Sequence, residues 1–201
     1  MSRQQTVQQT RLAFEFIERL YFEVSYLIKE VEGLLADEEE QFVIGKPSGY
    51  GITTRRSTGL ETANVHAWPL RKLAVFFVPK AATRVTGGTT NTKLEGNKVI
   101  YLRLVLNDKD LAEPTISFGL LYGFEKRSAA SDWPTKFEHL MAHLEYADTR
   151  VFSTPEAINY DIAQIKFKGK LITTNLYDIT DSEQVAKQIV APMLRLFREL
   201  D

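Results

Sequence analysis

Two aspartates and a lysine in the second half of the chain are of the types that hold a divalent cation against a phosphate ester. In such sites carboxylates bind the metal ion, and a lysine stabilises charge on the reacting phosphate. Asp148 and Asp161 precede Lys166, which ends the triplet Gln164-Ile165-Lys166 on a predicted strand. The three residues are therefore candidates for metal-dependent hydrolysis.

Over this short stretch alone, the chain resembles the signature of the PD-(D/E)xK nucleases. The resemblance implies a divalent-metal-dependent nuclease or phosphoesterase that uses Asp148, Asp161 and Lys166. Gln164 stands where that signature has its second carboxylate, so one metal ligand is missing. We therefore keep this function as an alternative and not as the leading hypothesis.

His139 and His143 are spaced as two metal ligands on adjacent turns of a helix. The metalloprotease pattern requires a glutamate directly after the first histidine, where this chain has Leu140. At about 100° per residue, the apolar residues of this predicted helix lie on the side opposite both histidines. We therefore favour two solvent-facing histidines over a metal site, and we expect no bound cofactor.

Positive charge is concentrated between Lys46 and Arg103. This block carries ten basic and two acidic side chains, whereas the net charge of the whole chain is −1. Such a block favours an anionic partner, and rings beside the cations can stack on the bases of single-stranded nucleic acid. The candidate binding residues are Tyr50, Arg55, Arg56, His66, Trp68, Arg71, Lys72, Lys80 and Arg84. The alternative is that the block neutralises the acidic N-terminal region inside the fold.

These patterns favour a non-catalytic binding or adaptor protein over an enzyme. Its basic central region would engage nucleic acid or an acidic protein surface. A third hypothesis is a structural subunit that forms a homo-oligomer through its N-terminal helix. The sequence has no glycine-rich phosphate loop and no Gly-x-Ser-x-Gly motif. Phosphate-loop and serine-hydrolase functions therefore have no support in it.

Composition limits the compartment and the chemistry. The chain has no cysteine, which excludes disulfides, thiolate metal ligands and thiol nucleophiles. Its longest apolar run, residues 73–78, is far too short to span a bilayer. We expect a cytoplasmic protein with no membrane partner.

The hydrophobic pattern predicts a single α+β domain over residues 1–201. We expect a sheet of about five to seven strands that is antiparallel or, as the alternative, mixed. Helices are expected to cover one of its faces. The predicted segments are an N-terminal helix (1–36), a basic β-sheet region (41–125), a helix (132–146), a hairpin turning at Lys168-Gly169 (163–177) and a C-terminal helix (181–200).

Three finer expectations follow from single residues. Phe22 and Tyr26 lie outside the main apolar stripe of the first helix, and we expect them to pack under another element rather than to mark a partner-binding surface. The strand at 98–107 has one purely aliphatic face and one mixed face, which is typical of a sheet covered on one side. Pro192 is expected to kink the C-terminal helix.

Overall fold

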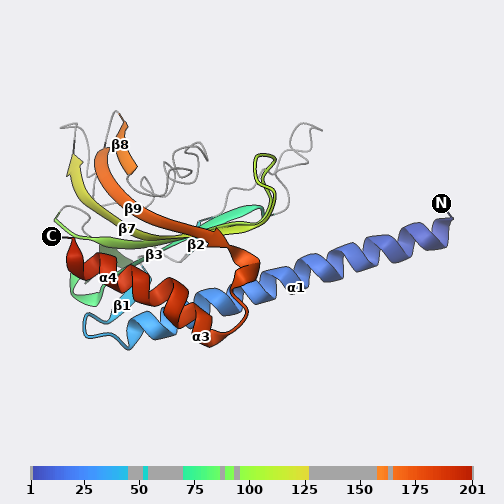
Figure 1. The fold of residues 1–201 in the computed structure, drawn as a ribbon, viewed down its shortest axis with the longest axis horizontal. Coiled ribbons are helices and arrows are strands. Elements are labelled where there is room, and N and C mark those ends of the chain that lie inside the picture. Colours follow the sequence, from blue (N-terminus) through green and yellow to red (C-terminus); the bar gives the residue numbers. More distant parts are fainter. Residues whose placement is uncertain are drawn as a thin grey trace.

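The computed structural model describes residues 2–44, 52–53, 70–86, 89–92, 96–126, 158–162 and 165–200. A long N-terminal helix, an antiparallel sheet and a C-terminal helical segment make up the fold (Figure 1). This arrangement confirms the predicted α+β class. The predicted helix at 132–146 lies outside the described residues.

Seven of the described strands form one sheet in which every pairing is antiparallel. The order is β1-β3-β6-β7-β9-β8, and β2 also pairs with β3. A second, two-stranded sheet pairs β4 with β5. The strands are β1 (Phe42–Ile44), β2 (Ile52–Thr53), β3 (Lys72–Pro79), β4 (Thr83–Thr86), β5 (Thr89–Thr92), β6 (Val99–Val105), β7 (Thr115–Lys126), β8 (Ile158–Ile162) and β9 (Ile165–Asn175).

Helices cover one face of the large sheet (Figure 1). The N-terminal helix is α1 (Arg3–Ala36), which ends at the acidic run that follows it, with Asp37 as its C-cap. The C-terminal segment comprises α3 (Ser182–Gln184), the π-helical η5 (Val185–Val190) and α4 (Ala191–Glu199). Two short 3-10 helices, η2 (Lys80–Ala82) and η4 (Leu176–Asp178), follow β3 and β9.

A continuous hydrophobic core lies between this face and the helices. From α1 it takes four residues spaced four, three and four apart, which is one face of a helix. From the strands it takes every second residue, as the pleat requires. These members are Val24, Ile28, Val31 and Leu35 of α1, Leu73, Val75 and Phe77 of β3, Ile100, Leu102 and Leu104 of β6, and Ile116, Phe118 and Leu120 of β7.

The mixed face of β6 is buried as well, so the expectation of a sheet covered on one side is wrong for this strand. All seven β6 residues are buried, including Arg103 with 3% of its surface exposed. On the same face, the rings of Phe76 and Tyr101 lie 5.2 Å apart, and the hydroxyls of Ser117 and Thr173 lie 2.8 Å apart. Polar side chains that find partners can be buried, so a mixed composition does not by itself indicate a solvent-facing surface.

The predicted hairpin turn at Lys168-Gly169 is also wrong, because β9 runs through both residues without interruption. Phe167, Gly169 and Leu171 are buried, while Lys168 and Lys170 between them are exposed. This two-residue alternation belongs to a strand. Gly169 pairs with Leu121 of β7 on one side and with Ile158 of β8 on the other, so it is a glycine inside the sheet and not a turn residue.

The C-terminal helix begins as its capping signal predicts, one residue later than expected. Asp181 is the N-cap, and its carboxylate accepts a hydrogen bond of 2.9 Å from the backbone amide of Gln184. Pro192 lies in the first turn of α4, directly after the π-helical turns of η5. A proline cannot donate a helical hydrogen bond, and here the helix changes its hydrogen-bonding period just before it.

Candidate functional site

Two segments of α1 have different surroundings. Residues 24–35 lie against the sheet and the C-terminal helices, whereas residues 3–16 extend beyond the body with no other described element beside them (Figure 1). Every residue from Ser2 to Phe16 is exposed, and Ile17 is the first that is partly buried. We call residues 3–16 the projecting segment and residues 24–35 the docked segment. At 1.5 Å per residue, the projecting segment is about 20 Å long.

Local interactions favour the helical form of the projecting segment. The Ser2 hydroxyl accepts from the amide of Gln5 at 3.3 Å, and the Gln5 side chain accepts from the amide of Ser2 at 2.8 Å. One turn apart, Arg11 and Glu15 form an ion pair of 2.7 Å. A capping box and such an ion pair contribute about 1 kcal/mol together. An isolated helix of this length is marginal in water, so its continuity with the docked segment also matters.

The projecting segment exposes large apolar side chains on more than one side. Phe14 and Phe16 are each 64% exposed, Leu12 is 55% exposed and Val7 is exposed as well. Phe14 and Phe16 are two residues apart, so they lie about 200° apart around the helix axis. The rest of the segment is mainly glutamine, threonine and charged residues, and exposed apolar side chains gathered on a surface mark an interaction site. The segment therefore has the surface of a helix that binds a partner.

An apolar groove of about 500 Å³ begins where the projecting segment meets the body. Leu20, Tyr26 and Leu27 of α1 line one wall, and Leu176 and Tyr177 of η4 belong to the other. Glu23 and Glu30 of α1 and Asp181 before α3 also line it, so its charged lining is acidic. Its lining includes the exposed aromatic side chains of Tyr26 and Tyr177.

Phe22 and Tyr26 are not packed under another element, so that expectation is wrong. They remain 64% and 69% exposed, respectively. Tyr26 lines the groove, and Phe22 lies one turn before it on the same outer side of α1. The rejected alternative of a partner-binding surface gains support from this exposure, because the exposed aromatics continue the apolar surface of the projecting segment.

Tyr21 marks the place where α1 leaves the body. Its hydroxyl donates to the backbone oxygen of Leu70 at 3.1 Å and accepts from the amide of Leu70 at 2.9 Å. Towards the N-terminus from this residue, Leu20 is the last described residue of α1 that packs against the core. The two hydrogen bonds therefore fix the base of the projecting segment.

Val7, Leu12 and Phe14 were not singled out from the sequence, although a signal for them exists. The buried residues of the docked segment recur with a seven-residue period, as Ile28 and Leu35 do. The same period continues through Phe14 and Val7. A heptad that runs past the region able to cover it indicates an additional helical contact. How much of this apolar surface is covered depends on how far the rest of the domain extends along the helix.

No family model, curated protein or solved structure matches this chain.

The described part of the predicted anion-binding set is divided between interior and surface. Lys72 forms an ion pair with Asp108, whose carboxylate is 8% exposed. Lys80 is exposed and donates to the Gln41 side chain at 3.2 Å, and Arg71 is partly buried. Lys72 is thus engaged inside the fold, with a partner in the turn after β6 and not on α1.

Asp108 has an altered acidity. The hydrogen bond from Lys72, followed by that from the amide of Asp110, lowers the pKa of the Asp108 carboxyl. The positive charges of Lys72 and Arg103 act in the same direction. The turn around Asp108 is therefore partly buried and charge-paired, which ties the start of β3 to the end of β6.

Five further members of the anion-binding set, Tyr50, Arg55, Arg56, His66 and Trp68, lie outside the described residues, and Arg84 is placed on β4 by its backbone alone. Binding of an anionic partner through the basic region therefore stays a prediction.

Asp161 and Lys166, the candidate hydrolytic residues that the structure describes, are direct cross-strand neighbours on β8 and β9. Lys166 also faces Glu125 of β7 and pairs with it at 3.2 Å. Glu125 is exposed and Lys166 is partly buried, so this lysine is already paired with a carboxylate of the sheet. Asp148, His139 and His143 lie outside the described residues.

Proposed function

We propose that the protein is a non-catalytic adaptor or structural subunit that binds another protein through the projecting segment of α1. The observation that supports this proposal is the exposure of large apolar side chains along a helix that leaves the body of the fold. Burying an exposed phenylalanine is worth roughly 2 kcal/mol, so several together supply substantial binding energy. Helices that dock by such residues are a common mode of protein recognition.

A protein partner fits this segment better than a lipid surface does. A helix that lies on a membrane has one apolar face and a polar face rich in lysine and arginine. Here Phe14 and Phe16 point in opposite directions, and the polar positions before Arg11 are mainly glutamine. In the described residues, no helix combines the length and the hydrophobicity needed to cross a bilayer.

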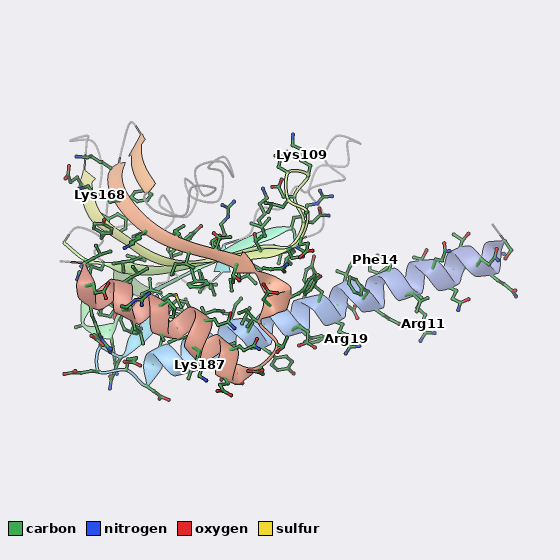
Figure 2. The ribbon with its side chains drawn as sticks, viewed as in Figure 1. Arg11, Phe14, Arg19, Lys109, Lys168 and Lys187 are labelled. Atoms are coloured by element: carbon green, nitrogen blue, oxygen red, sulfur yellow. The ribbon has the colours of Figure 1, made fainter. Side chains whose placement is uncertain are left out.

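The proposal is tested by a photo-crosslinking amino acid placed at Phe16 of the full chain in living cells. Phe16 lies in the projecting segment, and the same substitution at exposed Lys109, on the loop between β6 and β7, serves as the control (Figure 2). We expect an adduct of discrete mass from Phe16, lost when Leu12 is replaced by glutamine, and none of that mass from Lys109. Absence of a protein adduct at Phe16 would refute the proposal. Adducts with lipid alone would refute it equally.

A further inference from the structure

We infer that the partner of the projecting segment is a second copy of this chain, with the two α1 helices packed side by side in opposite directions. The inference rests on the proposed function, because it names the occupant of the same surface. Three properties of α1 support it: the continuity of one apolar line with the groove, the distribution of charge along the helix, and the area that pairing would bury.

One apolar line runs from the projecting segment into the groove. Leu12, Phe16 and Leu20 are four residues apart, so they lie on adjacent turns of the same side of α1. Leu20 already lines the groove, together with Leu27 further along the helix. A second helix laid on Leu12 and Phe16 therefore continues directly into the groove. The surface offers one binding site for a long helix and not two separate patches.

Charge changes sign along α1. The residues from Arg3 to Arg19 carry three arginines and two glutamates, whereas those from Glu23 to Glu32 carry three glutamates and one lysine. Asp181 adds a further negative charge beside the groove. A helix that enters the groove should therefore be positively charged at the end that meets Glu23 and Glu30. The projecting segment of a second copy has that charge.

The charge pattern also selects the direction of packing. In a parallel pair, the glutamates of the two docked segments would face one another. In an antiparallel pair with its two-fold axis near residue 21, Arg19 of each copy faces Glu23 of the other, and Phe16 faces Tyr26. The same axis brings Arg11 of one copy near Glu30 of the other. Each contact occurs twice, as in other interfaces with two-fold symmetry.

The two-fold axis also places protein beside Phe14, which lies on the side of the projecting segment away from Phe16. Phe14 is two seven-residue periods before Ile28, so the two residues lie on nearly the same side of α1. On that side Ile28 is buried in the core. A two-fold axis perpendicular to two antiparallel helices keeps both bodies on the same side of the pair. The body of one copy thus lies on the side where the other copy carries Phe14. Both apolar sides of the segment then face protein.

The area is sufficient for a specific dimer. Aromatic side chains offer about 150–250 Å² each, so the exposed parts of Leu12, Phe16 and Tyr26, with their neighbours, amount to roughly 500 Å² per copy. Two copies together would bury about 1,000 Å² before flanking charged side chains are counted, which reaches the lower bound of specific interfaces. A symmetric pair of α1 helices therefore meets the minimum area of about 1,000 Å² for a biological interface.

Charge reversal on the purified full-length protein tests the inference. We measure mass by light scattering over a range of concentrations for the wild type, Arg19→Glu and Glu23→Arg. We expect a wild-type dimer, and a dissociation constant raised at least about tenfold in each variant, because like charges then face one another at two symmetric positions. Mixing the two variants should restore association, since each copy then presents the charge that the other lacks.

The mixing experiment separates the dimer contact from effects within one helix. Arg19 and Glu23 are four residues apart, so each reversal also alters a pair inside its own helix. Mixing cannot repair that intrahelical pair, and it can repair only a contact between copies. Restored association in the mixture supports the inference. A wild type that is monomeric at every concentration, or a dimer indifferent to both reversals and to mixing, overturns it.

A short bismaleimide crosslinker tests direction, because the chain has no cysteine of its own. We expect Phe16→Cys to crosslink to Tyr26→Cys when the two variants are mixed, and neither to crosslink efficiently to itself. Self-crosslinking of Phe16→Cys alone would show a parallel pair and overturn the inference. If the purified protein is monomeric while Phe16 captures a protein of another mass in cells, the second-copy inference fails and the proposed function stands.

Discussion

The docked and projecting segments of α1 both carry large apolar side chains, but buried ones occur only in the docked segment. In the docked segment Leu35 is fully buried, whereas in the projecting segment Leu12 is 55% exposed. Both are helical, and the hydrogen bonds within a helix require no neighbour. The comparison teaches that forming a helix and burying it are separate requirements. The docked segment stabilises the fold, and we assign the projecting segment to binding.

The largest expected effect comes from replacing one leucine by alanine in each segment, which removes three side-chain carbons in both cases. Leu35→Ala should destabilise the fold by about 2–5 kcal/mol, because it leaves a cavity in a closed core. Leu12→Ala should change the free energy of unfolding of the isolated monomer by no more than about 0.5 kcal/mol. Urea denaturation at a protein concentration below the dimer threshold measures both. Equal losses in the two variants would mean that the projecting segment belongs to the folded core.

Tyr21→Phe tests where the boundary between the segments lies. The change removes both hydrogen bonds to Leu70 and leaves the ring in place. We expect a loss of about 1–2 kcal/mol, because the partly buried amide and carbonyl of Leu70 lose their partner. Faster amide exchange should appear between residues 17 and 23 and not beyond Val24. Unchanged exchange in this stretch would place the base of the projecting segment elsewhere.

Asp108→Asn tests whether the turn after β6 holds Leu70, the partner of Tyr21, in place. The backbone oxygen of Arg71, next to Leu70, accepts a hydrogen bond of 2.7 Å from the amide of Leu106 in this turn. We expect a loss of about 1–2 kcal/mol near pH 7, where the Lys72–Asp108 pair is intact. The native pKa of Asp108 is lowered, so its contribution is complete above the unfolded-state value of about 3.9 and disappears as pH falls through the native value.

Urea titrations of Asp108→Asn and the wild type at several pH values measure this contribution. The difference between the two proteins should shrink below about pH 4. A difference that stays constant down to about pH 2 would show that the ionised carboxylate is not its source.

The smallest effect concerns the projecting segment alone. Arg11→Ala removes the exposed ion pair with Glu15, and we expect a cost of only about 0.3–0.5 kcal/mol to helix formation. Circular dichroism of the monomer should show slightly less helix, with an unchanged midpoint of global unfolding. A lowered midpoint would indicate that this end of α1 is coupled to the core.

Sequence periodicity predicted the parts of the fold in which local pattern and final environment agree. The helix from Arg3 to Ala36, the strands β3, β6 and β7, and the cap at the start of the C-terminal helix follow from residue spacing, turn residues and capping residues. The predicted turn at Lys168-Gly169 was wrong because glycine is typical of turns when it is considered alone. The lysines at 166, 168 and 170 already show the two-residue alternation of a strand.

The binding surface was harder to predict, because burial depends on how far the rest of the domain extends. Nothing in the residue types distinguishes Leu12 from Leu35. Only the position of the sheet and of the C-terminal helical segment decides which of them is covered. Lys72 illustrates the same limit for charge, since its partner Asp108 lies 36 residues away in sequence and becomes adjacent only when β3 pairs with β6.

Amide hydrogen exchange along α1, measured at high and low protein concentration, tests the assignment of the projecting segment to binding most directly. The docked segment should be protected equally at both concentrations, because its partners belong to the same chain. Residues 3–16 should be protected at high concentration and should exchange rapidly after dilution. Protection of residues 3–16 that does not change on dilution would contradict the assignment, as would rapid exchange at both concentrations.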